Sequence, residues 1–167
     1  NWEGGRRLLM NRSVQAAVIE NGASVILGEG LAYDRCSVGI VTNIVSDEED
    51  LSRWDTQPTG GEYYTTPRSI YRTQVDVVLP SGHAVLNAED ELVADFAELC
   101  DGEVIFFAVD PANPTLLAHL AAGKRGVTVA DKRVVLRSGA DEIRLSRLVD
   151  APYIGKAKQA KNIANVL

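Results

Sequence analysis

Residues 83–108, HAVLNAEDELVADFAELCDGEVIFFA, contain the pattern that decides the fold class. Short apolar runs open and close this stretch, at residues 83–87 and 104–108, and neither alternates strictly, which is typical of strands covered on both faces. Four residues between the runs have the three-and-four spacing of one apolar helical stripe: Leu92, Val93, Phe96 and Leu99. A strand, a helix over residues 89–99 and a second strand predict a parallel α/β unit.

The same rhythm continues on both sides of this unit. Two more strands are predicted upstream, at residues 16–20 and 38–42. Short amphipathic patterns predict helices over residues 24–31, 69–79 and 114–122, the last with Pro114 in its first turn and Gly123 as its stop. After Gly126 the pattern changes to short β-type runs separated by Asp-Lys and Ser-Gly-Ala-Asp turns, at residues 127–129, 134–136 and 143–145.

These elements predict an α/β fold with a mostly parallel, doubly wound sheet and a small antiparallel ribbon near the C-terminus. The chain begins at Asn1 without an initiator methionine and reaches Leu167 inside a stretch with helical apolar periodicity. We therefore expect residues 1–167 to form a single partial domain, truncated from a longer protein.

Composition excludes several functional classes. The chain has 46% apolar residues, enough for a core, and a net charge of −6 with 6% aromatics, which argues against binding to nucleic acid. The longest apolar run, residues 104–109, is too short to span a membrane. Cys36 and Cys100 are too few for a disulfide framework, so we expect reduced, buried thiols and a cytoplasmic protein.

Polar residues follow three of the four predicted parallel strands: Glu20 and Asn21, Thr42 and Asn43, and Asn87. Because the carboxyl ends of parallel strands meet at one edge, we expect these residues to line up there, where ligands bind in open sheets. Glu20 at the end of a buried strand requires a partner. Either it pairs with Arg35, or this acidic edge holds Mg²⁺ and a polyphosphate.

Three further features have a structural and a functional interpretation. Residues 44–67 form a long polar loop with an acidic run at Asp47–Asp50, and loops of this length are usually functional or mobile. Lysines 156, 158 and 161 form either the solvated face of a helix or a phosphate contact beside Asn162. His83 and His119 are expected to be packing or surface residues rather than ligands.

Five stretches resemble the Mur-ligase-like domain of cyanophycin synthetases, and the similarity runs from the first ten residues to the end of the chain. The stretch Gly30–Cys36, GLAYDRC, is specific to that family, whereas VLNAED at residues 85–90 resembles a motif of Mur-type ligases in general. The five stretches are residues 18–23, 29–43, 72–80, 84–90 and 100–107.

The resemblance implies an ATP- and Mg²⁺-dependent amino-acid ligase. Its Mur-type domain adds arginine to the side-chain carboxylates of an aspartate polymer through an acyl phosphate, and a separate ATP-grasp domain builds the polymer. The implied partners are the rest of its own chain, with the phosphate-binding loop and the ATP-grasp domain, and an amino acid and a polypeptide as substrates. We also expect a homo-oligomer, and neither nucleic acid nor a membrane as partner.

The resemblance also implies roles for individual residues. Glu20 matches the strand-end Mg²⁺ carboxylate. Asn165 matches an asparagine that contacts adenine, and Asn162 has the spacing of a second such asparagine. Asn87 and Asp90 match the shared Asn-Ala-Asp-Asp motif, with either a structural or a nucleotide-binding role.

The sequence departs from the family pattern at its lysines. All five lysines lie at or beyond Lys124, so the loop ending in Gly-Lys-[Ser/Thr] is absent and would belong upstream of Asn1. The lysine that is carbamylated in many Mur ligases would fall near residues 69–71, which are Ser-Ile-Tyr. Residues 46–49 replace the usual Asp-His pair, so Asp47 and Glu48 either supply metal-binding carboxylates or belong to an acidic solvated loop.

These departures leave three hypotheses. The first is a fragment of a cyanophycin-synthetase-like ligase, inactive by itself. The second is another Mur-type ligase, acting on cell-wall precursors or folylpolyglutamate, which the GLAYDRC stretch disfavours. The third is a non-catalytic module that binds nucleotide or serves in assembly.

Overall fold

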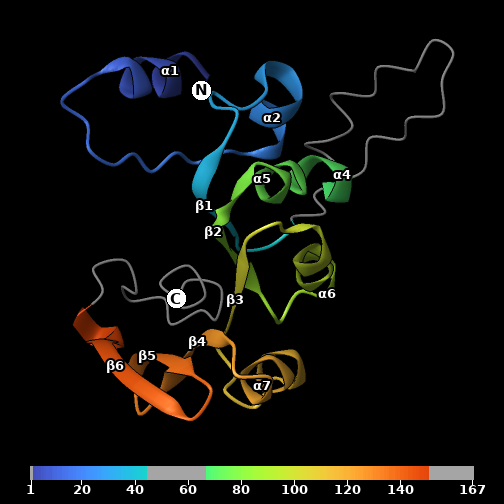
Figure 1. Ribbon diagram of the computed structural model, residues 1–167, viewed down its shortest axis with the longest axis vertical. Coiled ribbons are helices and arrows are strands. Elements are labelled where there is room, and N and C mark those ends of the chain that lie inside the picture. The colour runs from blue at the N-terminus through green and yellow to red at the C-terminus, as the bar shows by residue number, and fades with distance from the viewer. Residues whose placement is uncertain (1, 45–66, 151–167) are drawn as a thin grey trace, which may run out of the picture.

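The computed structural model describes residues 2–44 and 67–150 and has an α/β fold (Figure 1). Six strands form one sheet in the order β1-β2-β3-β4-β5-β6. The first four pair in parallel, and β4, β5 and β6 pair antiparallel. The strands are β1 Cys36–Val41, β2 Val78–Asn87, β3 Glu103–Ala108, β4 Arg125–Ala130, β5 Arg133–Ser138 and β6 Asp141–Arg147. The predicted α/β class and the C-terminal antiparallel ribbon are confirmed.

Two helices precede the sheet, a 3₁₀ helix follows its last strand, and the other helical segments connect its strands. The helices before β1 are α1 Trp2–Met10 and α2 Ala23–Glu29. The later segments are α4 Pro67–Tyr71, α5 Thr73–Asp76, α6 Glu91–Ala94, the 3₁₀ helix η1 Asp95–Leu99, α7 Pro114–Ala121 and the 3₁₀ helix η2 Leu148–Asp150. No helix in the described ranges is long and apolar enough to cross a membrane.

The connections between parallel strands pack on one face of the sheet. Their buried residues form the main core with alternate strand residues: Val75, Val93, Phe96, Leu116 and Leu120 from the helical segments, and Val41, Ala84, Leu86 and Phe106 from the strands. A smaller cluster on the opposite face contains Phe107, Val127 and Val134. Parallel connections are almost always right-handed, so strands that follow one another in chain order place all their crossovers on the same side.

Glycines allow the helical segments to approach this face closely. A Cβ at Gly39 of β1 would collide with the carbonyl oxygen of Gln74 in α5, and one at Gly126 of β4 would lie 2.5 Å from Cδ1 of Leu116. Both contacts are too short for real side chains. α5 can therefore pack this closely on β1 only because Gly39 lacks a side chain, and Gly126 leaves room for the end of the Leu116 side chain from α7.

The turns of the antiparallel ribbon agree with the predicted turn residues. Asp131 and Lys132 connect β4 to β5 with φ values of 49° and 60°, as a two-residue type I′ turn requires. Gly139, with φ 57°, lies in the turn between β5 and β6. Because β4 also pairs with β3, the ribbon is continuous with the parallel sheet and not a separate unit.

Two predicted elements are corrected by the structure. The strand predicted at residues 16–20 is wrong: the segment is irregular and Val18 is 96% exposed. The helix predicted over residues 69–79 is split into α4 and α5 and ends at Asp76, since Val78 and Leu79 belong to β2. A short apolar run does not by itself distinguish helix from strand.

The other predicted helices are confirmed with small changes. The helix predicted over residues 24–31 is α2, which begins one residue earlier, at Ala23, and ends at Glu29. Helix α7 begins at Pro114, and Gly123 follows its end with φ 76°. The helix predicted over residues 89–99 is α6 continued by the 3₁₀ helix η1. The predicted loop at residues 44–67 lies largely outside the described residues.

We expect Gly39→Ala to destabilise the chain by about 1–3 kcal/mol, because the added methyl group must displace the backbone of α5. Gly22→Ala is the matched control, since a Cβ there meets nothing within 4 Å. Urea unfolding followed by circular dichroism measures both. Equal midpoints for the two variants would contradict the close approach of α5 to β1.

The buried imidazole of His119 generates a prediction about pH. Burial lowers the pKa of His119 below its ordinary value of 6.5, and its Nε2 donates to the carbonyl oxygen of Val104 at 3.0 Å. A group with a lowered folded-state pKa costs stability as the pH falls below its unfolded value. The free energy of unfolding should therefore decrease from pH 7.5 to pH 5, and less steeply in His119→Gln. If the free energy of unfolding changed with pH in the same way in the original protein and in His119→Gln, the pKa of His119 would be equal in the folded and unfolded states.

Candidate functional site: the rim at the strand tips

The carboxyl ends of β1, β2 and β3 form a polar edge of the sheet, which we call the strand-tip rim. It consists of Thr42, Asn43, Asn87, Glu89 and Asp110. The parallel registers of β1 with β2 and of β2 with β3 bring these tips side by side. The prediction of one polar edge is confirmed for Thr42, Asn43 and Asn87, and it is wrong for Glu20 and Asn21, which do not follow a strand.

Asn87 joins the tips of β1 and β2. It is 7% exposed, and its Nδ2 donates to the carbonyl oxygen of Thr42 at 2.8 Å. Its Oδ1 accepts from the backbone N–H of Glu89 at 2.9 Å. Both ends of the amide are therefore engaged by backbone groups, and Asn87 holds two strand tips at a fixed separation.

Asp90 connects the chain after β1 to the start of α6 through hydrogen bonds. Its Oδ1 accepts from the backbone N–H groups of Leu92 and Val93, at 3.1 and 3.2 Å, which makes it the N-cap of the helix. Its Oδ2 accepts from the N–H of Ile44 at 3.0 Å. Each carboxylate oxygen thus receives backbone donors, which supports the structural interpretation of this residue. A nucleotide-binding role for Asn87 and Asp90 stays a prediction.

The tip of β3 is held in a similar way by residues that the sequence analysis missed. Glu89 accepts from the N–H of Asp110 at 2.8 Å through Oε1. Asn113 donates from Nδ2 to the carbonyl oxygen of Ala88 at 3.2 Å and caps α7 by accepting from the N–H of Leu116 at 3.0 Å. The sequence signal for Asn113 was an asparagine directly before Pro114, which is typical of an N-cap followed by the first helical residue.

Glu20 lies away from any strand end. It is exposed, in the irregular segment between α1 and α2, and forms no ion pair with Arg35 within the described part of the chain. Arg35 instead donates to the carbonyl oxygen of Asp76 at 3.4 Å. The strand-end argument for Glu20 is therefore removed, and its role as a Mg²⁺ ligand stays a prediction based on the resemblance alone.

The other predicted ligands lie outside the described residues: Asp47, Glu48, Asn162 and Asn165. Within residues 2–44 and 67–150, no group of three or more His, Cys, Asp or Glu side chains could hold a metal ion. Cys36 and Cys100 are free thiols, partly rather than fully buried.

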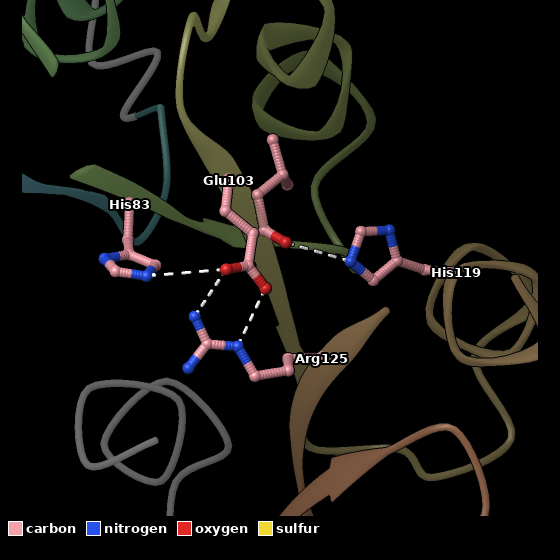
Figure 2. A network of polar contacts seen from close by, with 5 residues as sticks. His83, Glu103, His119 and Arg125 are labelled. Atoms are coloured by element: carbon pink, nitrogen blue, oxygen red, sulfur yellow. Dashed lines mark hydrogen bonds and ion pairs between the residues drawn. The ribbon is translucent and has the colours of Figure 1, made fainter. Parts of the chain in front are cut away.

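An ion-pair network lies at the other end of the strands, on the face opposite the helices (Figure 2). Glu103 accepts from Arg125 through both oxygens, at 2.7 and 2.6 Å, and Nε2 of His83 lies 3.5 Å from Oε2. Hydrogen bonding from Arg125 lowers the pKa of Glu103. His119 packs edge-on against Phe106, as expected for a packing residue.

The fold and the rim define an α/β protein with a mostly parallel sheet and a polar edge at its strand tips, a class that binds ligands at that edge. The chain is 32% identical over 160 residues to a cyanophycin synthetase of Synechocystis sp.. It is 31% identical to that of Crocosphaera subtropica and 29% identical to that of Geminocystis herdmanii. Each match covers 96% of this chain and 18% of the relative.

The chain is thus similar over nearly its whole length to one segment of the cyanophycin synthetases, and the predicted resemblance is confirmed. It spans less than a fifth of the length of these relatives. No protein-family model matches the chain.

We expect Asp90→Ala to destabilise the chain by about 2–3 kcal/mol in the absence of any nucleotide, because three backbone N–H groups lose a charged acceptor. Glu98→Ala is the control, since Glu98 is an exposed acidic residue of η1. Urea unfolding gives both values. An unchanged free energy of unfolding in Asp90→Ala would show that the hydrogen bonds of Asp90 contribute little to stability. It would favour a role for Asp90 in binding only.

Proposed function

We propose that this chain is a segment of an ATP- and Mg²⁺-dependent amino-acid ligase, whose whole polypeptide adds arginine to the side chains of polyaspartate through an acyl phosphate. The observation that carries the proposal is the similarity of 96% of the chain to proteins named cyanophycin synthetase. The GLAYDRC stretch at residues 30–36 favours this ligase over other Mur-type ligases.

The strand-tip rim supports the proposal because it is a braced surface at the edge where open parallel sheets bind ligands. Asn87 and Asp90 hold the backbone at this edge, and we assign nucleotide contacts to the surface they shape. Adenine contacts by Asn162 and Asn165 belong to this proposal, as do the metal-binding carboxylates of Glu20, Asp47 and Glu48. The rest of the ligase, including its phosphate-binding loop, is the proposed partner of this segment, in a cytoplasmic homo-oligomer.

A non-catalytic assembly module is the second candidate. One observation favours it: the polar atoms of Asn87 and Asp90 are engaged by the protein's own backbone. Calorimetry with Mg·ATP on the natural full-length protein and its Glu20→Ala variant separates the two candidates. Affinities that differ support the ligase, and identical affinities favour the module.

We expect the isolated 167-residue chain to show no ATP hydrolysis above that of its Glu20→Ala variant. The sequence contains no Gly-rich loop ending in Gly-Lys-[Ser/Thr], so the groups that grip the phosphates in P-loop enzymes are missing. Phosphate release in the presence of Mg·ATP measures the activity. Turnover that depends on Glu20 would show that this segment contains its own phosphate-binding apparatus.

The proposed substrate is tested on the longest natural polypeptide that contains this segment. We expect ADP release to require both arginine and a polyaspartate primer, with arginine appearing on the primer by mass spectrometry. Muramyl peptides and folylpolyglutamate are the control substrates. Turnover with either control, and none with polyaspartate, would assign the protein to another Mur-type ligase.

A further inference from the structure

The strands at the two ends of the sheet, β1 and β6, differ in how their free edges are protected. Each pairs with a neighbouring strand on one side only (Figure 1). An edge strand presents a row of N–H and C=O groups that can pair with another strand, and proteins usually protect such edges with charged residues, proline or bulges. The described part of the chain therefore has two edges at which further pairing must be considered.

The edge formed by β6 is protected. Its register with β5 shifts between Arg133 and Val135, which is typical of a bulge. Four of its seven residues are charged: Asp141, Glu142, Arg144 and Arg147. Both features oppose the addition of another strand beside β6.

The edge formed by β1 has none of these protections. Residues 36–43, CSVGIVTN, contain no charged residue and no proline. The pairing of β1 with β2 is regular from Val38 to Val41. Within the described ranges, no backbone hydrogen bond joins residues 37–41 to any segment other than β2. The outer edge of β1 can therefore accept a further strand along most of its length.

The side chains beside this edge are apolar. Val38 is 49% exposed and Ile40 is 52% exposed, on the face of the sheet opposite the main core. Ile40 is the Cα partner of Val85, which is the partner of Ile105, so an apolar row crosses three strands and ends at the free edge. Backbone pairing is the same for every sequence, and alternate side chains provide the specificity. A strand that fits here is thus apolar at alternate positions.

Strand β1 itself has the required pattern. If a second copy of β1 runs antiparallel with Gly39 opposite Gly39, Val38 of each copy lies opposite Ile40 of the other. Side chains directly opposite in an antiparallel pair have Cβ atoms about 4.5–5.5 Å apart, and β-branched pairs at that distance are stabilising. The edge is therefore self-complementary.

The charge of the chain also favours β1 as the contact between copies. The net charge of −6 makes two copies repel each other, and like charges directly opposite in a sheet are destabilising. Because residues 36–43 are uncharged, a pair of β1 strands brings no like charges into opposite positions. Contact between β1 and β6 would instead leave a free edge at each end and continue without closing, whereas contact between two β1 strands closes after two copies.

We propose that two copies of this chain pair through β1, antiparallel about a two-fold axis at Gly39, so that their sheets join into one continuous sheet. The antiparallel arrangement places the two strand-tip rims at opposite edges of the joined sheet. The interface does not rest on the proposed ligase activity, and it provides a specific contact for the proposed homo-oligomer.

Sedimentation equilibrium of the 167-residue chain tests the association. The average mass should rise with concentration from one chain to two chains and no further. Ile40→Lys should weaken the association by about tenfold or more, because the two-fold axis brings both added charges into the interface. Leu117→Lys is the matched control, since Leu117 is 44% exposed on α7, on the other side of the sheet, and it should leave the association unchanged.

Three results of this measurement would overturn the proposal: a monomer at every concentration, assemblies larger than two chains, or equal association in the Ile40→Lys and Leu117→Lys variants. Far-UV circular dichroism verifies that each variant is folded.

Disulfide formation between chains tests the register. One preparation carries Val38→Cys and the other Ile40→Cys, both with Cys36→Ser and Cys100→Ser. After mild oxidation of the mixture, bridges between positions 38 and 40 should predominate over 38–38 and 40–40 bridges, whose Cβ atoms are diagonal neighbours about 7–8 Å apart. Mixing Val38→Cys with Leu117→Cys is the control and should give few mixed bridges. Equal yields of all bridges would contradict the two-fold axis at Gly39.

The same pair of variants in the longest natural polypeptide that contains this segment tests for another occupant. Bridges between positions 38 and 40 of two polypeptides should form there as well. Thiols at both positions that form no bridge and resist alkylation would make a strand of the same polypeptide the neighbour of β1, and would overturn the pairing of two copies. No substrate is needed, so the result is separate from the test of the ligase activity.

Discussion

The handedness of the parallel connections is the constraint on which the rest of this structure depends. Strands β1 to β4 lie in the sheet in chain order, and right-handed crossovers then place α5, α6 with η1, and α7 on the same side. The main core forms there, and glycines at Gly39 and Gly126 let the helical segments approach the strands. The same arrangement aligns the carboxyl ends of four strands at one edge and leaves the apolar row of Ile40 and Val85 on the other face.

Backbone donors and acceptors explain why the strand-tip rim needs polar side chains even without a ligand. A chain that leaves a sheet exposes N–H and C=O groups that no longer have a ladder partner. Asn87 and Asp90 satisfy such groups at Thr42, Glu89 and Ile44, and Asn113 does the same at Ala88. The stability of the fold and the position of a ligand are therefore coupled at this edge. The side chains that hold the strand ends in place also determine where a ligand can contact the backbone.

Sequence-based predictions were accurate where the deciding pattern lies within a short stretch of sequence, and they failed where it depends on distant residues. The unit at residues 83–108 was predicted correctly because its apolar periods are long and bounded, and the Asp131–Lys132 turn because two positive φ values restrict the residues that fit. The strand at residues 16–20 failed because pairing depends on a neighbour that the pattern does not specify. The prediction that Thr42 and Asn87 lie at one edge followed from the geometry of parallel sheets. The contact between Asp90 and the N–H of Ile44, 46 residues away, depends on a tertiary distance that no spacing encodes, whereas its contacts with Leu92 and Val93 are local.

The charge of the rim restricts what this segment can contribute to a ligase. Its named side chains are amides, a hydroxyl and the carboxylates of Glu89 and Asp110, and carboxylates repel the phosphates of ATP unless cations intervene. Lys132 lies in the turn after β4, at the same edge of the sheet as the tip of β3, whereas Lys124 precedes β4 at the opposite edge. A rim of this composition orients sugar hydroxyls, an amine or a hydrated cation more readily than it neutralises a triphosphate. Under the proposed function, the charge that binds the phosphates is thus better supplied by polypeptide beyond the rim, and the rim serves to position the other groups.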